Sequence, residues 1–81
     1  MSVSELLHLQ LVSKVCAELD NHLGLSDRTL AEFIIHLAGE HASDPRGFTA
    51  ALAENGAEFP AAFAESLHRL IRRISSRIRT H

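Results

Sequence analysis

The chain has 81 residues, enough for one domain with a single shared core and too few for two independent cores. Hydrophobic residues make up 46% of the sequence and charged residues 22%, a composition that excludes a disordered tail. No apolar run approaches the roughly 18–20 residues that cross a bilayer, and the single cysteine, Cys16, cannot form an internal disulfide. We therefore expect one folded intracellular domain over residues 1–81, with no membrane association.

The formal net charge is −2, but the charges are unevenly distributed. Residues 1–65 contain all ten acidic residues and three basic ones, whereas residues 66–81 contain five arginines and no acidic residue. The sequence therefore predicts an acidic body that ends in a basic segment. Trp and Tyr are absent and only four Phe occur, which favours a core of aliphatic side chains and hence helices.

The first predicted helix covers residues 4–23. Ser2 and Glu5 have the spacing of a capping box, which satisfies backbone amides of a first helical turn. Gly24 ends the helix, because glycine readily adopts the left-handed conformation of a C-terminal cap. Apolar residues recur every three or four positions, as along one buried helical face: Leu9, Val12, Cys16, Leu19 and Leu23, with Leu11 and Val15 beside them.

The second predicted helix covers residues 27–39. We expect Ser26 to cap its N-terminus, and Leu25 and Leu30 have the spacing of a hydrophobic staple across that cap. Its predicted apolar face consists of Leu30, Phe33, Ile34, Leu37 and Ala38.

Two further helices are predicted over residues 45–54 and 60–78. Pro45 and Pro60 each stand at a first helical position, where the missing amide hydrogen does no harm, and Asn55-Gly56 predicts the turn between the helices. The last helix has its apolar residues on about a third of its circumference: Phe63, Leu67, Leu70, Ile71, Ile74 and Ile78. Four amphipathic helices with short loops predict an all-α fold, a compact bundle of four helices.

Four segments carry a resemblance to a known family: LVSKVCAELDNHLG (residues 11–24), LAEFI (30–34), NGAEF (55–59) and LHRLI (67–71). In this order they resemble the N-terminal helical domain of the Prp22-type DEAH-box pre-mRNA splicing helicase, an ATP-dependent RNA helicase. The resemblance spans roughly residues 6–74, which is more than amphipathic patterning alone produces.

The resemblance implies that the chain is a PWI-like helical domain of a larger helicase that acts in the nucleus and releases mature mRNA from the spliceosome. The full-length helicase uses ATP and Mg²⁺. This chain contains neither a Gly-x-x-x-x-Gly-Lys-Ser/Thr phosphate loop nor an Asp-Glu-Ala-His box. We therefore expect a non-catalytic module, with no cofactor or metal ion of its own, that docks the helicase onto spliceosomal proteins.

The most distinctive candidate site is the arginine-rich face of the last predicted helix, formed by Arg69, Arg72, Arg73 and Arg79. Three interpretations stay open: contact with RNA phosphates, binding of an acidic protein, and an exposed face without a partner. An auxiliary RNA-binding role is the alternative function, although no aromatic residue is interleaved for base stacking. A homodimer through the end of the last helix, with Ile74 and Ile78 exposed, is a further prediction.

Neither the histidines nor the cysteine predicts a chemical site. Zinc needs three or four converging ligands, and we expect the six histidines on the surface or near helix ends. Cys16 lies on an apolar stripe, where a thiol behaves as a small hydrophobe. A domain of this size also leaves little room for a ligand pocket of about 300 Å³ or more, so we expect no enzyme activity on a small molecule.

Overall fold

The computed structural model describes the backbone of residues 3–79 and the side chains of residues 5–75. It contains four helices, α1 (Val3–Leu23), α2 (Arg28–Glu40), α3 (Pro45–Glu54) and α4 (Ala61–Arg79), and the described residues form no strand. The predicted all-α fold is confirmed, and each predicted helix end lies within one residue of the observed one. No helix in this part of the chain combines the length and apolar character of a membrane span.

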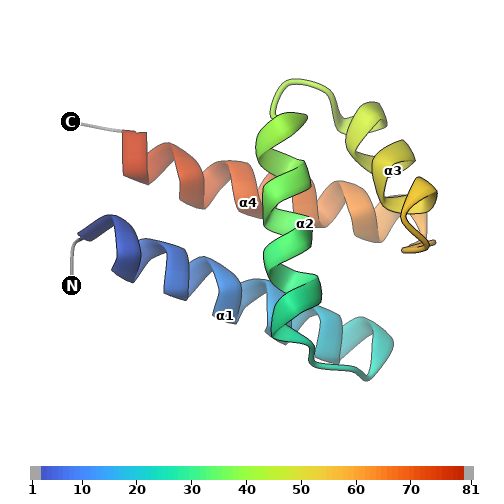
Figure 1. Cartoon of the computed structure of the whole chain (residues 1–81), viewed down its shortest axis with the longest axis horizontal. Coiled ribbons are helices and arrows are strands. Elements are labelled where there is room, and N and C mark those ends of the chain that lie inside the picture. Colours follow the sequence, from blue (N-terminus) through green and yellow to red (C-terminus); the bar gives the residue numbers. More distant parts are fainter. Residues whose placement is uncertain (1–2, 80–81) are drawn as a thin grey trace.

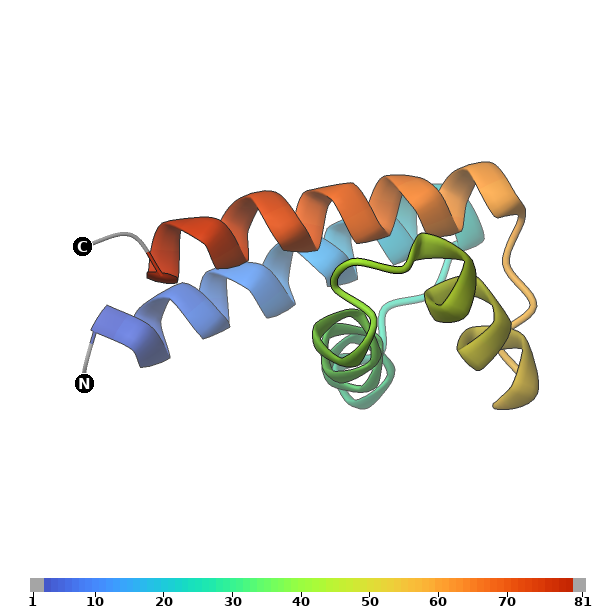
Figure 2. The ribbon, with the colours of Figure 1, turned by 90° about the horizontal axis from the view of Figure 1, so that it is seen from above.

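The helices form two layers. Figures 1 and 2 show α1 and α4 side by side and running in opposite directions, so the start of α1 and the end of α4 lie at the same end of the molecule. In the second layer, α2 crosses both of these helices, and α3 packs against α2 and α4. Over the described residues α1 and α3 do not contact each other.

The core lies where α2 crosses α1 and α4 and where α3 closes the side of the crossing. All four helices contribute to it. The largest side chains that are almost fully removed from solvent are Val15 and Leu19 of α1, Ile34 of α2, Phe48 and Leu52 of α3, and Leu67 of α4. Each apolar face is therefore covered by at least two other helices.

The predicted apolar stripe of α1 is displaced from the observed one. Leu9 and Leu23, expected in the core, are each 37% exposed, and Cys16 between them is only partly buried. These three residues are seven positions apart and share one edge of the stripe, whose buried centre runs through Leu11, Val15 and Leu19. The sequence pattern contained both the Leu9–Cys16–Leu23 row and the Leu11–Val15–Leu19 row. Only the contact with α2 and α4 determines that the second row lies at the centre of the buried face.

The helix ends at Gly24 and Gly56 agree with the sequence, but the starts of α2 and α4 differ: α4 begins at Ala61, so Pro60 precedes the helix and is not its first residue. Ser2, of the predicted capping box, lies outside the described residues. Gly24 and Gly56 have positive φ angles of 70° and 86°, as expected for residues that end a helix. Asp44 caps α3, where its carboxylate accepts a hydrogen bond from the Gly47 amide at 3.0 Å. The N-cap of α2 is Asp27 and not Ser26, because the Asp27 carboxylate accepts a hydrogen bond from the Leu30 amide at 3.2 Å.

This shift of one residue also removes the predicted staple. Ser26, and not an apolar residue, now precedes the cap, and Leu25 is 40% exposed. The spacing of Leu25 and Leu30 therefore no longer corresponds to a staple across the observed cap.

One histidine lies in the core, although all six were expected on the surface or near helix ends. His68 is only 2% exposed, and its ring lies 5.4 Å from that of Phe48, centroid to centroid. Its Nε2 lies 2.8 Å from the carbonyl oxygen of His41, which can only accept a hydrogen bond, so Nε2 is the donor. The bond ties α4 to the loop between α2 and α3.

The cap of α2 can be tested by comparing two adjacent substitutions. Asp27→Ala removes the acceptor for the Leu30 amide, and we expect it to lower the free energy of unfolding by about 1 kcal/mol. Ser26→Ala should change it by less than about 0.5 kcal/mol. Urea denaturation followed by circular dichroism measures both, and a larger loss at Ser26 would contradict this cap assignment.

The His68 hydrogen bond can be tested with a variant of similar size. His68→Leu removes the donor to the His41 carbonyl, which keeps its bond from the Asp44 amide at 3.0 Å. We expect the free energy of unfolding to fall by about 1 kcal/mol. His36→Leu is the control, because His36 is exposed and should tolerate the change within about 0.5 kcal/mol. Equal losses for the two variants would show that the buried bond contributes nothing.

Candidate functional site

The arginines of α4 line a surface groove beside the start of α3. We call it the arginine groove; it encloses about 510 Å³ and is lined by Pro45, Glu65, His68, Arg69, Arg72 and Arg73. Its existence follows from the pattern of α4, in which Leu67 and Ile71 point into the core and the arginines therefore face solvent. Sequence reasoning expected little room for a space of this volume, and that expectation is wrong for the surface.

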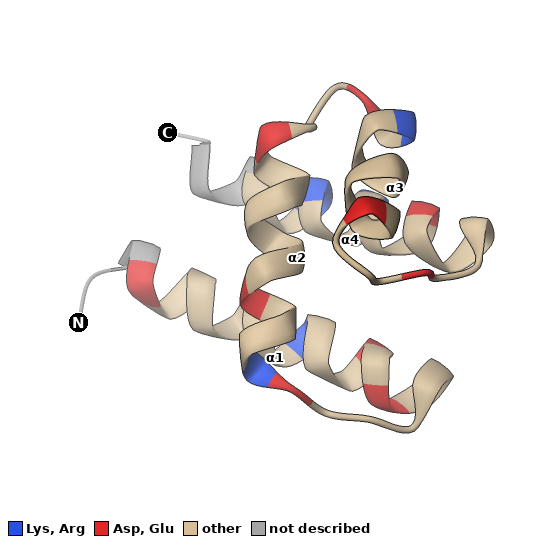
Figure 3. Cartoon of the chain, turned by 45° about the vertical axis from the view of Figure 1, so that its right-hand side comes forward, with Lys and Arg blue, Asp and Glu red and all other residues tan. Residues whose placement is uncertain are grey.

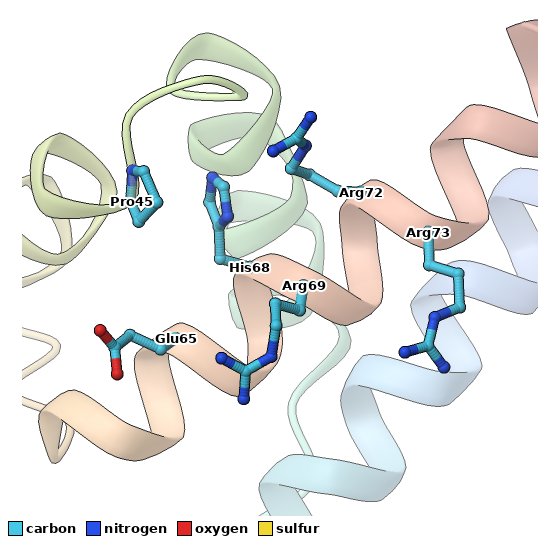
Figure 4. A pocket seen from close by; sticks show the side chains of 6 residues that line it. All are labelled: Pro45, Glu65, His68, Arg69, Arg72 and Arg73. Atoms are coloured by element: carbon cyan, nitrogen blue, oxygen red, sulfur yellow. The ribbon is translucent and has the colours of Figure 1, made fainter.

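The three described arginines do not form one continuous row. Figure 4 shows Arg69 and Arg73 pointing to one side of α4 and Arg72 pointing to the other. Arg72 also lines a second, smaller groove with Ala42 and Ser43 of the loop between α2 and α3. The structure thus brings Arg69 and Arg73 together on one side of the arginine groove and places Arg72 at its opposite rim.

Arg69 and Arg73 form no ion pair with any other residue whose side chain the structure describes. Among the described residues no carboxylate oxygen lies within 4.0 Å of either guanidinium, although Glu65 stands one helical turn before Arg69. The Arg69 side chain donates a long hydrogen bond from Nη2 to the Ser66 hydroxyl oxygen, at 3.4 Å. Both guanidinium groups are exposed and keep donors for an external acceptor.

His68 and Pro45 form the wall of the arginine groove on the side of the α2–α3 loop. The His68 ring is held by its bond to the His41 carbonyl, so this wall has a defined position relative to α4. Sequence reasoning missed His68 as part of the site. The signal was present, because position 68 lies four residues after Ala64 and three before Ile71, both buried on the apolar stripe of α4.

Outside α4 the charged residues of the domain are predominantly acidic. Figure 3 shows Asp and Glu on every helix and in the connecting loops. Arg28, for example, pairs with Glu32 at 3.6 Å between Nε and Oε1. Arg69 and Arg73 are therefore basic groups on an otherwise acidic domain.

Other predicted positions contribute no second site. The side chains of Arg79 and Ile78 lie outside the described residues. Ile74, predicted as exposed apolar surface for a dimer, is only 8% exposed because it packs into the core. Cys16 carries a free, partly buried thiol, and the described residues include no group of three His, Cys, Asp or Glu side chains that could hold a metal ion.

The comparisons with known proteins agree with the resemblance in the sequence. No protein-family model matches the chain. The pre-mRNA-splicing factor ATP-dependent RNA helicase prp22 of Schizosaccharomyces pombe is 42% identical over 72 residues, which is 89% of this chain and only 6% of that helicase. The predicted resemblance is thus confirmed: the chain is similar in sequence, over nearly all its length, to a small segment of a Prp22-type splicing helicase.

Proposed function

We propose that this chain is a non-catalytic, PWI-like domain of an ATP-dependent RNA helicase that acts in pre-mRNA splicing and releases mature mRNA from the spliceosome. The domain docks the helicase onto spliceosomal proteins in the nucleus. ATP and Mg²⁺ bind elsewhere in the full-length helicase and not to residues of this chain.

The observation that carries this proposal is the 42% identity to a splicing helicase over 72 residues, a match confined to a segment far too small to hold a helicase core. The chain also has no phosphate-loop motif with which to bind ATP. The domain exposes the arginine groove and several leucines of α1, such as Leu6, which is 48% exposed. Surfaces of this kind suit binding and positioning.

Affinity purification from nuclear extract tests the docking function. The immobilised chain should enrich spliceosomal proteins, identified by mass spectrometry, relative to a Leu19→Asp variant. Leu19 is fully buried, so a charge there should unfold the domain and remove its surface. Failure to enrich any splicing protein over this variant would count against docking.

An auxiliary RNA-binding function is the second candidate, because the exposed guanidinium groups of Arg69 and Arg73 could contact phosphates. With about two phosphates neutralised, affinity for single-stranded RNA should fall about sevenfold between roughly 50 and 200 mM salt. We expect weak binding even at the lower salt, since the acidic residues outside α4 repel a polyanion. A fluorescence anisotropy titration with labelled oligouridine measures this, and the absence of binding at roughly 50 mM salt would contradict the RNA function.

A further inference from the structure

We propose that the arginine groove binds an acidic segment of a protein partner, with Arg69 and Arg73 each contacting a carboxylate. This inference rests on the proposed docking function and names its surface. The observation behind it is the pair of exposed guanidinium groups, one helical turn apart, on the same side of α4 and without carboxylate partners among the described residues.

The spacing of the two arginines fits an extended acidic peptide. Four residues of an α-helix rise about 6 Å, which separates the origins of the Arg69 and Arg73 side chains along α4. In an extended chain, side chains two positions apart point to the same face and are separated by about 6.6 Å. A segment with acidic residues at alternate positions can therefore present one carboxylate to each arginine. The planar guanidinium group can bind a carboxylate through two parallel hydrogen bonds.

Contacts within the domain hold one wall of the groove in place. Its wall on the loop side consists of Pro45, the first residue of α3, and His68, which is held by the hydrogen bond to the His41 carbonyl at 2.8 Å. Arg72 stands at the opposite rim from Arg69 and Arg73 and adds positive charge there. A peptide that enters the groove would meet a defined surface, which limits the conformational entropy lost on binding.

The aromatic side chains distinguish a protein partner from RNA. The chain has four Phe and no Tyr or Trp. Phe48 and Phe63 are buried, Phe33 and Phe59 are partly buried against the core, and none of the four lines the groove. Among the described residues that line it, only His68 has an aromatic ring. His68 is 2% exposed and its ring is held by the His41 carbonyl, so it offers almost no open face for base stacking, the interaction that single-stranded RNA usually requires. Glu65 at the edge of the groove opposes a continuous polyanion, whereas a peptide can place a neutral residue beside it.

A peptide titration tests the proposal. The probe is a fluorescein-labelled ten-residue peptide of alternating Glu and Gly, and the control peptide has Gln in place of Glu. At roughly 50 mM salt we expect the Glu peptide to bind at least about tenfold more tightly than the Gln peptide, because charge-assisted hydrogen bonds are the stronger kind. Binding measured by fluorescence anisotropy that is equal for the two peptides, or absent for both, would overturn the proposal.

Two double variants identify the surface. Arg69→Gln with Arg73→Gln should weaken binding of the Glu peptide at least about tenfold, since both charged contacts are lost. Lys14→Gln with Arg28→Gln removes the same charge from α1 and α2, where neither residue lines the groove, and should weaken binding less than about threefold, through long-range attraction only. Circular dichroism measures whether both variants remain folded. Equal losses in the two variants would show non-specific attraction and overturn the proposal.

The outcome also separates this inference from the docking function on which it rests. If oligouridine of ten nucleotides binds more tightly than the Glu peptide and loses as much affinity in the Arg69 and Arg73 variant, the groove recognises RNA and the proposal is wrong. If that variant still enriches splicing proteins from nuclear extract as the unchanged chain does, docking uses another surface. If the variant loses both the peptide and the splicing proteins, the groove is the docking surface.

Discussion

The structure depends on burying four narrow apolar faces in one shared core. Each helix is amphipathic, and α3 has only ten residues, too few to be stable as an isolated helix in water. Phe48 of α3, Ile34 of α2 and Leu67 of α4 are almost completely removed from solvent, and burying each such side chain stabilises the fold by roughly 1.5–3 kcal/mol. Because α2 crosses α1 and α4, and α3 packs against α2 and α4, each of these faces is covered by at least two other helices.

The arginine groove is a consequence of the same constraint. Since Leu67 and Ile71 must point into the core, position 69 between them and positions 72 and 73 after them are directed to solvent. His68 belongs to the buried face, and its bond to the His41 carbonyl holds the α2–α3 loop against α4. Pro45, which follows this loop, thereby lies beside the arginines. A core contact thus determines the shape of the surface where we place the partner.

Much of the fold and part of the candidate site could be predicted from the sequence. Helix ends were within one residue because capping residues, prolines and glycines act on the few residues next to them. The exposure of Arg69, Arg72 and Arg73 followed from the apolar period of α4. The expectations about the central row of α1 and about His68 as a surface residue were wrong. Both depend on contacts between helices, which the pattern of a single helix does not specify. The sequence pointed to Ser26 and not to Asp27 as the N-cap of α2, because these adjacent residues are both good N-caps.

By itself, the sequence determined that this chain forms four amphipathic helices with one basic face, and it carried the similarity to a splicing helicase that the comparison confirmed. Both depend on local patterns and on residue identity. Only the tertiary structure decided that Arg69 and Arg73 share one side of a groove with Arg72 at the opposite rim, that Pro45 and His68 form its wall, and that Ile74 is buried. These relations join residues on different helices, and they arise from the way the helices cross when their apolar faces leave water.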